Sequence, residues 1–492
     1  MRPQRLSAWL AGLAVLAAGL VLMAMRLAYD LFDADELQHA HLAWLVAGGK
    51  QLYVDIWDNH GPLYTLANAV VLRLADPAPS LDLLFACRAL SACAAIGIGA
   101  CTWLIARRAG LSRLAALTAV SILASLVFAQ DKAMECRPDG WQNLFWLAGL
   151  ALLATGTTLR RAAGAGALWA SAILINAKAA LGPLAVLLFW LLGRRWHGRT
   201  VIETRRAIVA AAAGGLAVYL PVLAWFQATG AAWALHEYAL LWNLQALGNS
   251  GPSTLSDDNV RFLVVRQWPF VLALLLGSVW WIVDLARRHE SLQREAAAMI
   301  ATAALITGLS LGMDFYYQFF LICLPLWSIV AAHGVQRSAV ALAERFGPVA
   351  SWTAGVAAAA GAAVLLATAA RITPESPRHE LVFQESFTRF MLATTPREEP
   401  LGVIWDICGG FMFNEPLQFY WGAEAAIGKA AERHAGSDPF GQPFIDALER
   451  GQVRFVIGRD TGLLNQLPAI TQSYLRERYR YSNCLWTRRT TP

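Results

Sequence analysis

A dense group of ionisable side chains follows directly on the first apolar segment of the chain, in the stretch YDLFDADELQHAHLAWLVAGG from Tyr29 to Gly49. Its ionisable residues include Asp33, Asp35, Glu36, His39 and His41. Clustered carboxylates can act as general bases or bind polar substrates. They can also simply cap and solvate the helix expected over ELQHAHLAWLV, and Asp33 or Asp35 stands at its N-cap position. Both interpretations stay open on these residues alone.

Three later stretches carry further polar candidates: QLYVDIWDNHGPLY (51–64), QDKAMECRPDG (130–140) and NAKAALG (176–182). Their ionisable residues include Asp58, His60, Lys132, Glu135, Arg137, Asp139 and Lys178. Each stretch lies next to an apolar run, so the elements that position these residues have to be established first.

The composition indicates a polytopic membrane protein. Of the 492 residues, 57% are hydrophobic and only 15% are charged, whereas soluble domains carry about 25% charged residues. The arginines occur in short pairs between apolar runs rather than on one basic face, which argues against nucleic-acid binding. The seven cysteines show no CxxC or Cys/His spacing, so the sequence predicts no metal site of that kind.

Apolar runs long enough to cross about 30 Å of hydrocarbon recur along the first 370 residues. We predict about eleven spans, at roughly 8–28, 82–106, 114–130, 141–159, 165–177, 179–193, 207–227, 268–286, 296–313, 317–336 and 348–370. The run 1–28 is long for a signal peptide and lacks a cleavage site before Tyr29, so we interpret it as an uncleaved first helix.

The positive-inside rule decides the orientation. With a cytoplasmic N-terminus and no crossing by 61–75, the arginine pairs after the spans all fall in inner loops. The segment 61–75 is therefore predicted to be an interfacial or re-entrant helix on the outer face, within a first outer loop over 29–81. The apolar residues of the helix after Asp35 are expected to lie along the membrane surface. The carboxylate-rich stretches fall on this outer side, where chemistry is expected.

From residue 371 the composition changes. Residues 371–492 contain no spanning run, and short β-like stretches (LGVIWDI, VRFVIG, CLWTRR) alternate with helical ones (EAAIGKAAERHA, PFIDALERG, AITQSYLRERY). This alternation predicts a small extracytoplasmic α/β domain after a membrane domain over 1–370. Cys408 and Cys484 lie there, and either a disulfide or two free thiols fits the sequence.

The order of these motifs resembles a known superfamily. The chain has an acidic pair after span one, then an amphipathic helix, then Y.D..D.HGPL leading into a second surface helix, and then E.RPDG opening a span. This order resembles that of the GT-C glycosyltransferases. The resemblance is to the bacterial relatives of protein O-mannosyltransferases and of the lipid A aminoarabinose transferase. It covers the first half of the chain well and the rest loosely, and Gly61 departs from the usual Pro-Pro-Leu.

The resemblance implies an all-α polytopic enzyme of the bacterial inner membrane that serves cell-envelope glycosylation. Such enzymes move a sugar from a polyprenyl-phosphate donor to a glycolipid, polysaccharide or protein acceptor on the extracytoplasmic face. Asp35 matches the first acid of the pair and is the expected general base, with Asp33 as the alternative. Glu36 is expected to assist or to bind the acceptor, and Asp139, or Glu135, to orient acceptor or sugar.

The remaining roles are assigned by the same resemblance. Donor phosphate is expected to meet Lys178, Arg137 and Arg88, because charge develops on the phosphate as the sugar leaves. The substrate pocket is expected to include Asp33, Glu135, His60, Tyr316 and Tyr317. The plainer interpretation of the two tyrosines is that they belong to an interfacial aromatic belt. The plainer interpretation of Lys178 is that its side chain snorkels to the membrane interface.

We predict no metal site and no required cofactor, although a divalent cation is compatible with the resemblance. His39 and His41 are two residues apart on a helix and face different directions, and a structural Asp58–His60 hydrogen bond is the plainer interpretation of that pair. Two alternatives to an enzyme remain. A transporter or flippase of a lipid-linked substrate would fit the intramembrane charges, although no inverted repeat is visible. A non-catalytic assembly subunit would make Asp35 and Asp139 dispensable.

Overall fold

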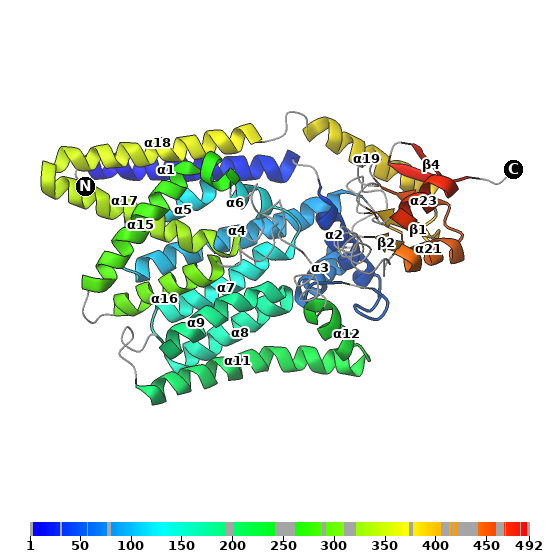
Figure 1. The fold of residues 1–492 in the computed structure, drawn as a ribbon, viewed down its shortest axis with the longest axis horizontal. Helices are drawn as coiled ribbons and strands as arrows, with labels where there is room; N and C mark the ends of the chain where they lie inside the picture. The colour runs from blue at the N-terminus through cyan, green and yellow to red at the C-terminus, as the bar shows by residue number, and fades with distance from the viewer. Residues whose placement is uncertain are drawn as a thin grey trace.

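The structure is a computed structural model with a long helical domain and a small α/β domain at one end (Figure 1). It describes residues 3–29, 32–56, 58–75, 80–192, 200–241, 261–287, 292–308, 321–372, 377–404, 413–414, 417–420, 441–458, 467, 469–482 and 484–489.

Helices occupy all eleven predicted spans, so the predicted all-α membrane architecture is confirmed. They are α1 (Pro3–Tyr29), α4 (Asp82–Arg108), α5 (Arg113–Ser125), α7 (Pro138–Ala154), α8 (Leu159–Ile175), α9 (Leu181–Leu192), α11 (Val201–Ala228), α15 (Trp268–Arg287), α16 (Leu292–Gly308), α17 (Leu324–Phe346) and α18 (Pro348–Ile372). Short elements join them: α6 (Val127–Lys132), η1 (Ala177–Ala180), α12 (Ala232–His236) and the π-turn η2 (Glu237–Leu241).

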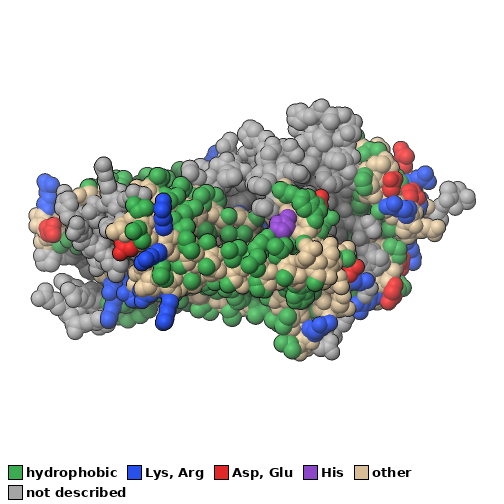
Figure 2. All heavy atoms as spheres, turned by 90° about the horizontal axis from the view of Figure 1, so that it is seen from below, with side chains coloured by type: hydrophobic (Ala, Val, Ile, Leu, Met, Phe, Trp, Pro, Cys, Tyr) green, Lys and Arg blue, Asp and Glu red, His purple; other side chains and the backbone are tan. Residues whose placement is uncertain are grey.

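The outer surface of this bundle is apolar. Four helices are long and apolar enough to cross a membrane by length and composition, over Trp9–Ala28, Asp82–Arg108, Val201–Ala228 and Trp268–Ala286. In α11 only Thr204, Ala207 and Phe226 are buried, although the helix is apolar all round. Such a helix needs lipid on its open side. Figure 2 shows hydrophobic side chains over the middle of one face, with Lys and Arg gathered toward its ends.

Glycines let α8 and α11 pack with their backbones almost in contact (Figure 1). A Cβ atom on Gly214 would lie 1.9 Å from the carbonyl oxygen of Ala163, and one on Gly166 would lie 1.8 Å from that of Ala211. Small residues at such contacts are typical of helix pairs in membranes, where close packing replaces the hydrophobic effect as the driving force.

Neighbouring glycines of α11 provide a matched test of this contact. We expect Gly214→Ala to reduce the free energy of unfolding by about 1–3 kcal/mol, because the new methyl group forces the two backbones apart. Gly215→Ala should be neutral or slightly stabilising, since the nearest heavy atom to its Cβ would be the carbonyl oxygen of Gly166, at 3.5 Å, and alanine favours helix. Unfolding of both variants in detergent, followed by circular dichroism, makes the comparison; equal stabilities would contradict it.

Two surface helices precede the second span. They are α2 (Ala34–Ala47) and α3 (Pro62–Ala75), and each has 14 residues. One expectation for α2 is wrong: its apolar face does not lie along the membrane. Leu37 and Ala40 are buried in a cluster with Met391 and Val403 of the C-terminal domain, because that domain covers the helix.

The C-terminal domain contains the predicted α/β arrangement. A five-stranded sheet has the order β2-β1-β3-β5-β4. Its strands are β1 (Leu401–Ile404), β2 (Leu417–Tyr420), β3 (Phe455–Ile457), β4 (Tyr479–Ser482) and β5 (Leu485–Arg488). The pairs β1–β2 and β1–β3 are parallel, and β3–β5 and β4–β5 are antiparallel. The helices are α19 (Pro377–Thr394), α21 (Gly441–Arg450) and α23 (Ala469–Arg478).

Five of the six stretches predicted for this domain match observed elements, and EAAIGKAAERHA lies outside the described residues. The helix α19 and the strands β2 and β4 were not predicted. Cys484 is disulfide-bonded, which decides the question left open for that residue, while Cys408 lies outside the described residues.

Candidate active site

The acidic stretch forms the N-terminus of α2. Asp33 is the N-cap, with its Oδ1 accepting from the backbone N–H groups of Asp35 (2.7 Å) and Glu36 (3.3 Å). The Glu36 carboxylate accepts in return from the backbone N–H of Asp33 at 3.2 Å, which completes a capping box. The capping interpretation is therefore confirmed for Asp33, and it leaves the other carboxylate oxygen of Asp33 for further partners.

Glu36 forms a buried ion pair with Arg88 of α4. Its Oε1 accepts from Arg88 Nε at 2.8 Å and its Oε2 from Nη2 at 2.6 Å. Glu36 is 0% exposed and Arg88 1%, and the guanidinium also stacks on Phe32 at 4.2 Å. Glu36 Oε1 accepts in addition from the backbone N–H of Cys136 at 2.7 Å. This pair ties α2 to α4 and is closed to solvent.

Arg137 gathers four carboxylates around one guanidinium. Its Nη1 lies 2.5 Å from Asp35 Oδ2 and 3.3 Å from Asp33 Oδ2. Its Nε lies 3.4 Å from Asp139 Oδ2 and 3.6 Å from Glu135 Oε2. Arg137 is also the N-cap residue of α7, so the start of that span aims the guanidinium at α2.

Lysine side chains complete the network. Lys178 of η1 forms an ion pair with Asp139, and η1 begins where the Asn176 side chain accepts from the Lys178 backbone N–H at 3.2 Å. Lys132 of α6 lies 3.1 Å from Asp33 Oδ2 and pairs with Glu135. No role had been assigned to Lys132. Its position three residues before Glu135 in the same loop was the available signal.

The groups differ in how far they reach solvent. The side chains of Asp33 and Asp35 are 35% and 38% exposed, and that of Lys178 is 17% exposed. Arg137 is 6% exposed and Asp139 3%. The network therefore offers two carboxylates and one ammonium group to a substrate, in front of a buried guanidinium.

Ion pairing sets the protonation state of Asp33. Burial raises the pKa of this carboxyl group, but Lys132 and Arg137 lower it further, and the net pKa lies well below the ordinary value. The stabilising contribution of its ion pairs is therefore complete above the ordinary pKa of about 3.9 and is lost only as the pH falls toward the folded-state value. At neutral pH the carboxylate is ionised.

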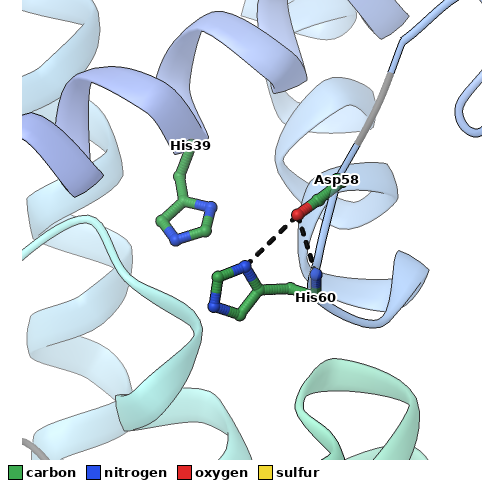
Figure 3. Close-up of side chains that lie close together, drawn as sticks. All are labelled: His39, Asp58 and His60. Carbon is green, nitrogen blue, oxygen red and sulfur yellow. Dashed lines mark hydrogen bonds and ion pairs between the residues drawn. The ribbon is translucent and has the colours of Figure 1, made fainter. Parts of the chain in front are cut away.

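His60 lies beside this network rather than in it. Its backbone N–H donates to Asp58 Oδ1 at 2.9 Å, and its Nδ1 lies 3.2 Å from the same oxygen, so the predicted Asp58–His60 hydrogen bond is confirmed. His39 of α2 packs on His60 with 4.7 Å between ring centroids. Figure 3 shows both rings and the Asp58 carboxylate turned toward a shared space. His41 is not part of this group.

The departure at Gly61 has a structural reason. The Gly61 backbone N–H donates to the carbonyl oxygen of Ile175 at 3.1 Å, and proline has no N–H to replace it. A Cβ atom on Gly61 would lie 2.0 Å from the carbonyl oxygen of Leu174. This contact holds the start of α3 against the end of α8, next to Lys178. Tyr316 and Tyr317, predicted for the pocket, lie outside the described residues.

Comparison with known proteins agrees with this architecture. The family model described as "Dolichyl-phosphate-mannose-protein mannosyltransferase" matches residues 59–225. The structure resembles ArnT from Cupriavidus metallidurans bound to undecaprenyl phosphate, with a TM-score of 0.63 and 13% identity over 92% of this chain and 94% of that one. The chain has the GT-C fold. A search of curated protein sequences finds no significant match.

An archaeal enzyme shares the same fold. The oligosaccharyltransferase of Archaeoglobus fulgidus in its apo form aligns with a TM-score of 0.63 and 11% identity over 95% of this chain and 72% of that one. The oligosaccharyltransferase AglB from the same organism, in complex with an inhibitory peptide and a dolichol-phosphate, aligns with a TM-score of 0.58 and 12% identity over 91% of this chain and 69% of that one. The predicted resemblance is thus confirmed at the level of the fold.

The buried Glu36–Arg88 pair generates a stability prediction. Glu36→Gln should reduce the free energy of unfolding by about 3–5 kcal/mol, because it leaves the Arg88 guanidinium buried without a counter-charge. The exposed pair Glu385–Arg389, 3.8 Å apart, provides the control, and Glu385→Gln should cost at most about 1 kcal/mol. Denaturant unfolding in detergent measures both, and a similar small loss in the two variants would show that Glu36 is not needed to hold α2 on α4.

Proposed function

We propose that this protein transfers a sugar from a polyprenyl-phosphate donor to an acceptor hydroxyl, with Asp35 as general base. One observation carries the proposal: the partly exposed carboxylate of Asp35 pairs with Arg137 at one end of an apolar helical domain, in a network where Asp33 pairs with Lys132 and Asp139 with Lys178. The ArnT structure with undecaprenyl phosphate and the AglB structure with dolichol-phosphate and peptide support lipid-linked donors for this fold.

The reaction needs one proton acceptor and one anion-binding group. The acceptor oxygen attacks the anomeric carbon, its proton passes to Asp35, and the bond from that carbon to the phosphate oxygen breaks with inversion. Negative charge then grows on the lipid phosphate, and Lys178 and Arg137 stabilise it. Asp139 keeps both cations in place through its contacts with each.

Arg137 links binding to base activation. In the structure its Nη1 is 2.5 Å from Asp35 Oδ2. While this ion pair holds, the Asp35 carboxylate is engaged by Arg137. A donor phosphate competes for the same guanidinium, since bidentate phosphate contacts suit arginine. Transfer of Arg137 from Asp35 to the phosphate frees the base only when donor is present. Glu36 and Arg88 form a buried ion pair with each other. In this proposal they position α2 and do not contact the substrate.

The orientation follows from charge. The N-terminus of α1 and the arginine-bearing ends of α4 and α15 lie at the end of the bundle away from α2 and α3 (Figure 1). By the positive-inside rule that end is cytoplasmic. The site and the C-terminal domain then face the extracytoplasmic side of a bacterial inner membrane, where the domain would contribute to the choice of a glycolipid, polysaccharide or protein acceptor.

Release of polyprenyl phosphate tests the proposal. Purified protein in nanodiscs receives a panel of polyprenyl-phosphate sugars and crude envelope acceptors. We expect Asp35→Asn to reduce release by about 100-fold or more, the scale for loss of a general base. Asp82→Asn, an exposed carboxylate hydrogen-bonded to Ser80, should leave release unchanged.

Two outcomes would redirect the proposal. Undiminished release in Asp35→Asn would keep the transferase and move the base to Asp33 or Asp139. Absence of release with every donor, while lipid-linked sugar crosses the bilayer in a flipping assay, would establish the transporter alternative.

A further inference from the structure

Three potential metal ligands meet outside the network that the proposed reaction uses. His39 comes from the middle of α2, and Asp58 and His60 come from the segment that leads into α3 (Figure 3). One ligand atom from each lies within 4.8 Å of the others. Two imidazole nitrogens and one carboxylate oxygen form a donor set common at zinc and other divalent transition-metal sites.

Asp58 is a buried carboxylate whose ion-pair partner, among the described residues, is a histidine rather than a lysine or an arginine. It is 0% exposed, and its ion-pair contact within the described part of the chain is with His60 alone. Its Oδ2 accepts from the Thr65 hydroxyl at 3.0 Å, which fixes the plane of the carboxylate. A buried carboxylate is costly unless a cation or a metal compensates it.

His39 supplies a second, independent indication. It is 1% exposed, and its Nδ1 is buried without a hydrogen-bond partner among the described residues. An unpaired buried nitrogen costs free energy comparable to a lost hydrogen bond. A neutral imidazole nitrogen has a lone pair that can bind a metal ion.

We propose that His39, Asp58 and His60 bind one divalent cation of the zinc class. At Zn–ligand distances of about 2.0–2.1 Å, two ligands of a tetrahedral ion lie about 3.4 Å apart. Asp58 Oδ1 and His60 Nδ1 are already 3.2 Å apart. The His39 ring has to rotate within its pocket to bring one of its nitrogens within bonding distance of the ion. Three protein ligands leave a fourth position, on the side where the His60 side chain is 22% exposed.

The local charge balance also favours a bound cation. The network around Arg137 pairs four carboxylates with three cations, and Asp58 adds a further carboxylate beside it. Two negative charges thus remain uncompensated among these described groups, which is unfavourable for binding a phosphate. A divalent ion would neutralise them, and it would join α2 to the segment before α3.

Metal analysis tests this inference without donor or acceptor, so its failure would leave the proposed function standing. The full-length protein, carrying an affinity tag without histidines, is stripped with chelator, reloaded with Zn²⁺, desalted and measured by mass spectrometry of metals. Reloading with Co²⁺ adds a second readout, because tetrahedral Co²⁺ with imidazole ligands absorbs visible light. The variants are His39→Gln and His60→Gln.

The control is His41→Gln, a buried histidine on the same helix that lies outside the ligand group. We expect one equivalent of Zn²⁺ in wild type and in His41→Gln, and at least a ten-fold weaker retention in His39→Gln and His60→Gln, each checked for a monodisperse fold. Wild type that retains no stoichiometric metal, or folded ligand variants that retain it as well as wild type, would overturn the proposal.

Discussion

The Glu36 carboxylate holds three separate parts of the chain together. It accepts hydrogen bonds from the α2 N-terminus, from Arg88 of α4 and from the backbone of Cys136 in the loop before α7. The position of Asp35 depends on this contact, since Asp35 lies one residue away on a surface helix. A buried charge pair of this kind contributes little net stability, yet removing one partner is costly. Its effect here is to give α2 a single orientation.

The geometry of the site follows from that anchoring. With α2 fixed, Asp33 and Asp35 meet Arg137 at the start of α7, and Asp139, two residues further on, meets Lys178 of η1. These charges lie at the end of the spans rather than within them, where the cost of desolvation is lower. The C-terminal domain closes the other side of α2 through Leu37 and Met391. Within the described part of the chain, Asp33, Asp35 and Lys178 are the more exposed groups of this network.

Much of the fold was predictable from hydropathy and charge. The helices in the eleven stretches predicted as spans, the short helix after Gly61 and the α/β character of the last 120 or so residues depend on local patterns that a membrane or a sheet imposes. The predictions were weaker where a tertiary partner changes the environment of a segment. The apolar face of α2 matches a membrane surface as well as a protein surface, and only the C-terminal domain decides between them.

The sequence by itself determined the membrane class, the positions of the spans and the residue types at the site, because lipid demands long apolar runs and leaves polar residues at their ends. Tertiary structure alone decided which charges pair. Glu36 and Arg88 are separated by 52 positions and Glu36 and Cys136 by 100, and no local pattern specifies such contacts. The same holds for His39, Asp58 and His60, which meet because packing brings α2 against the start of α3.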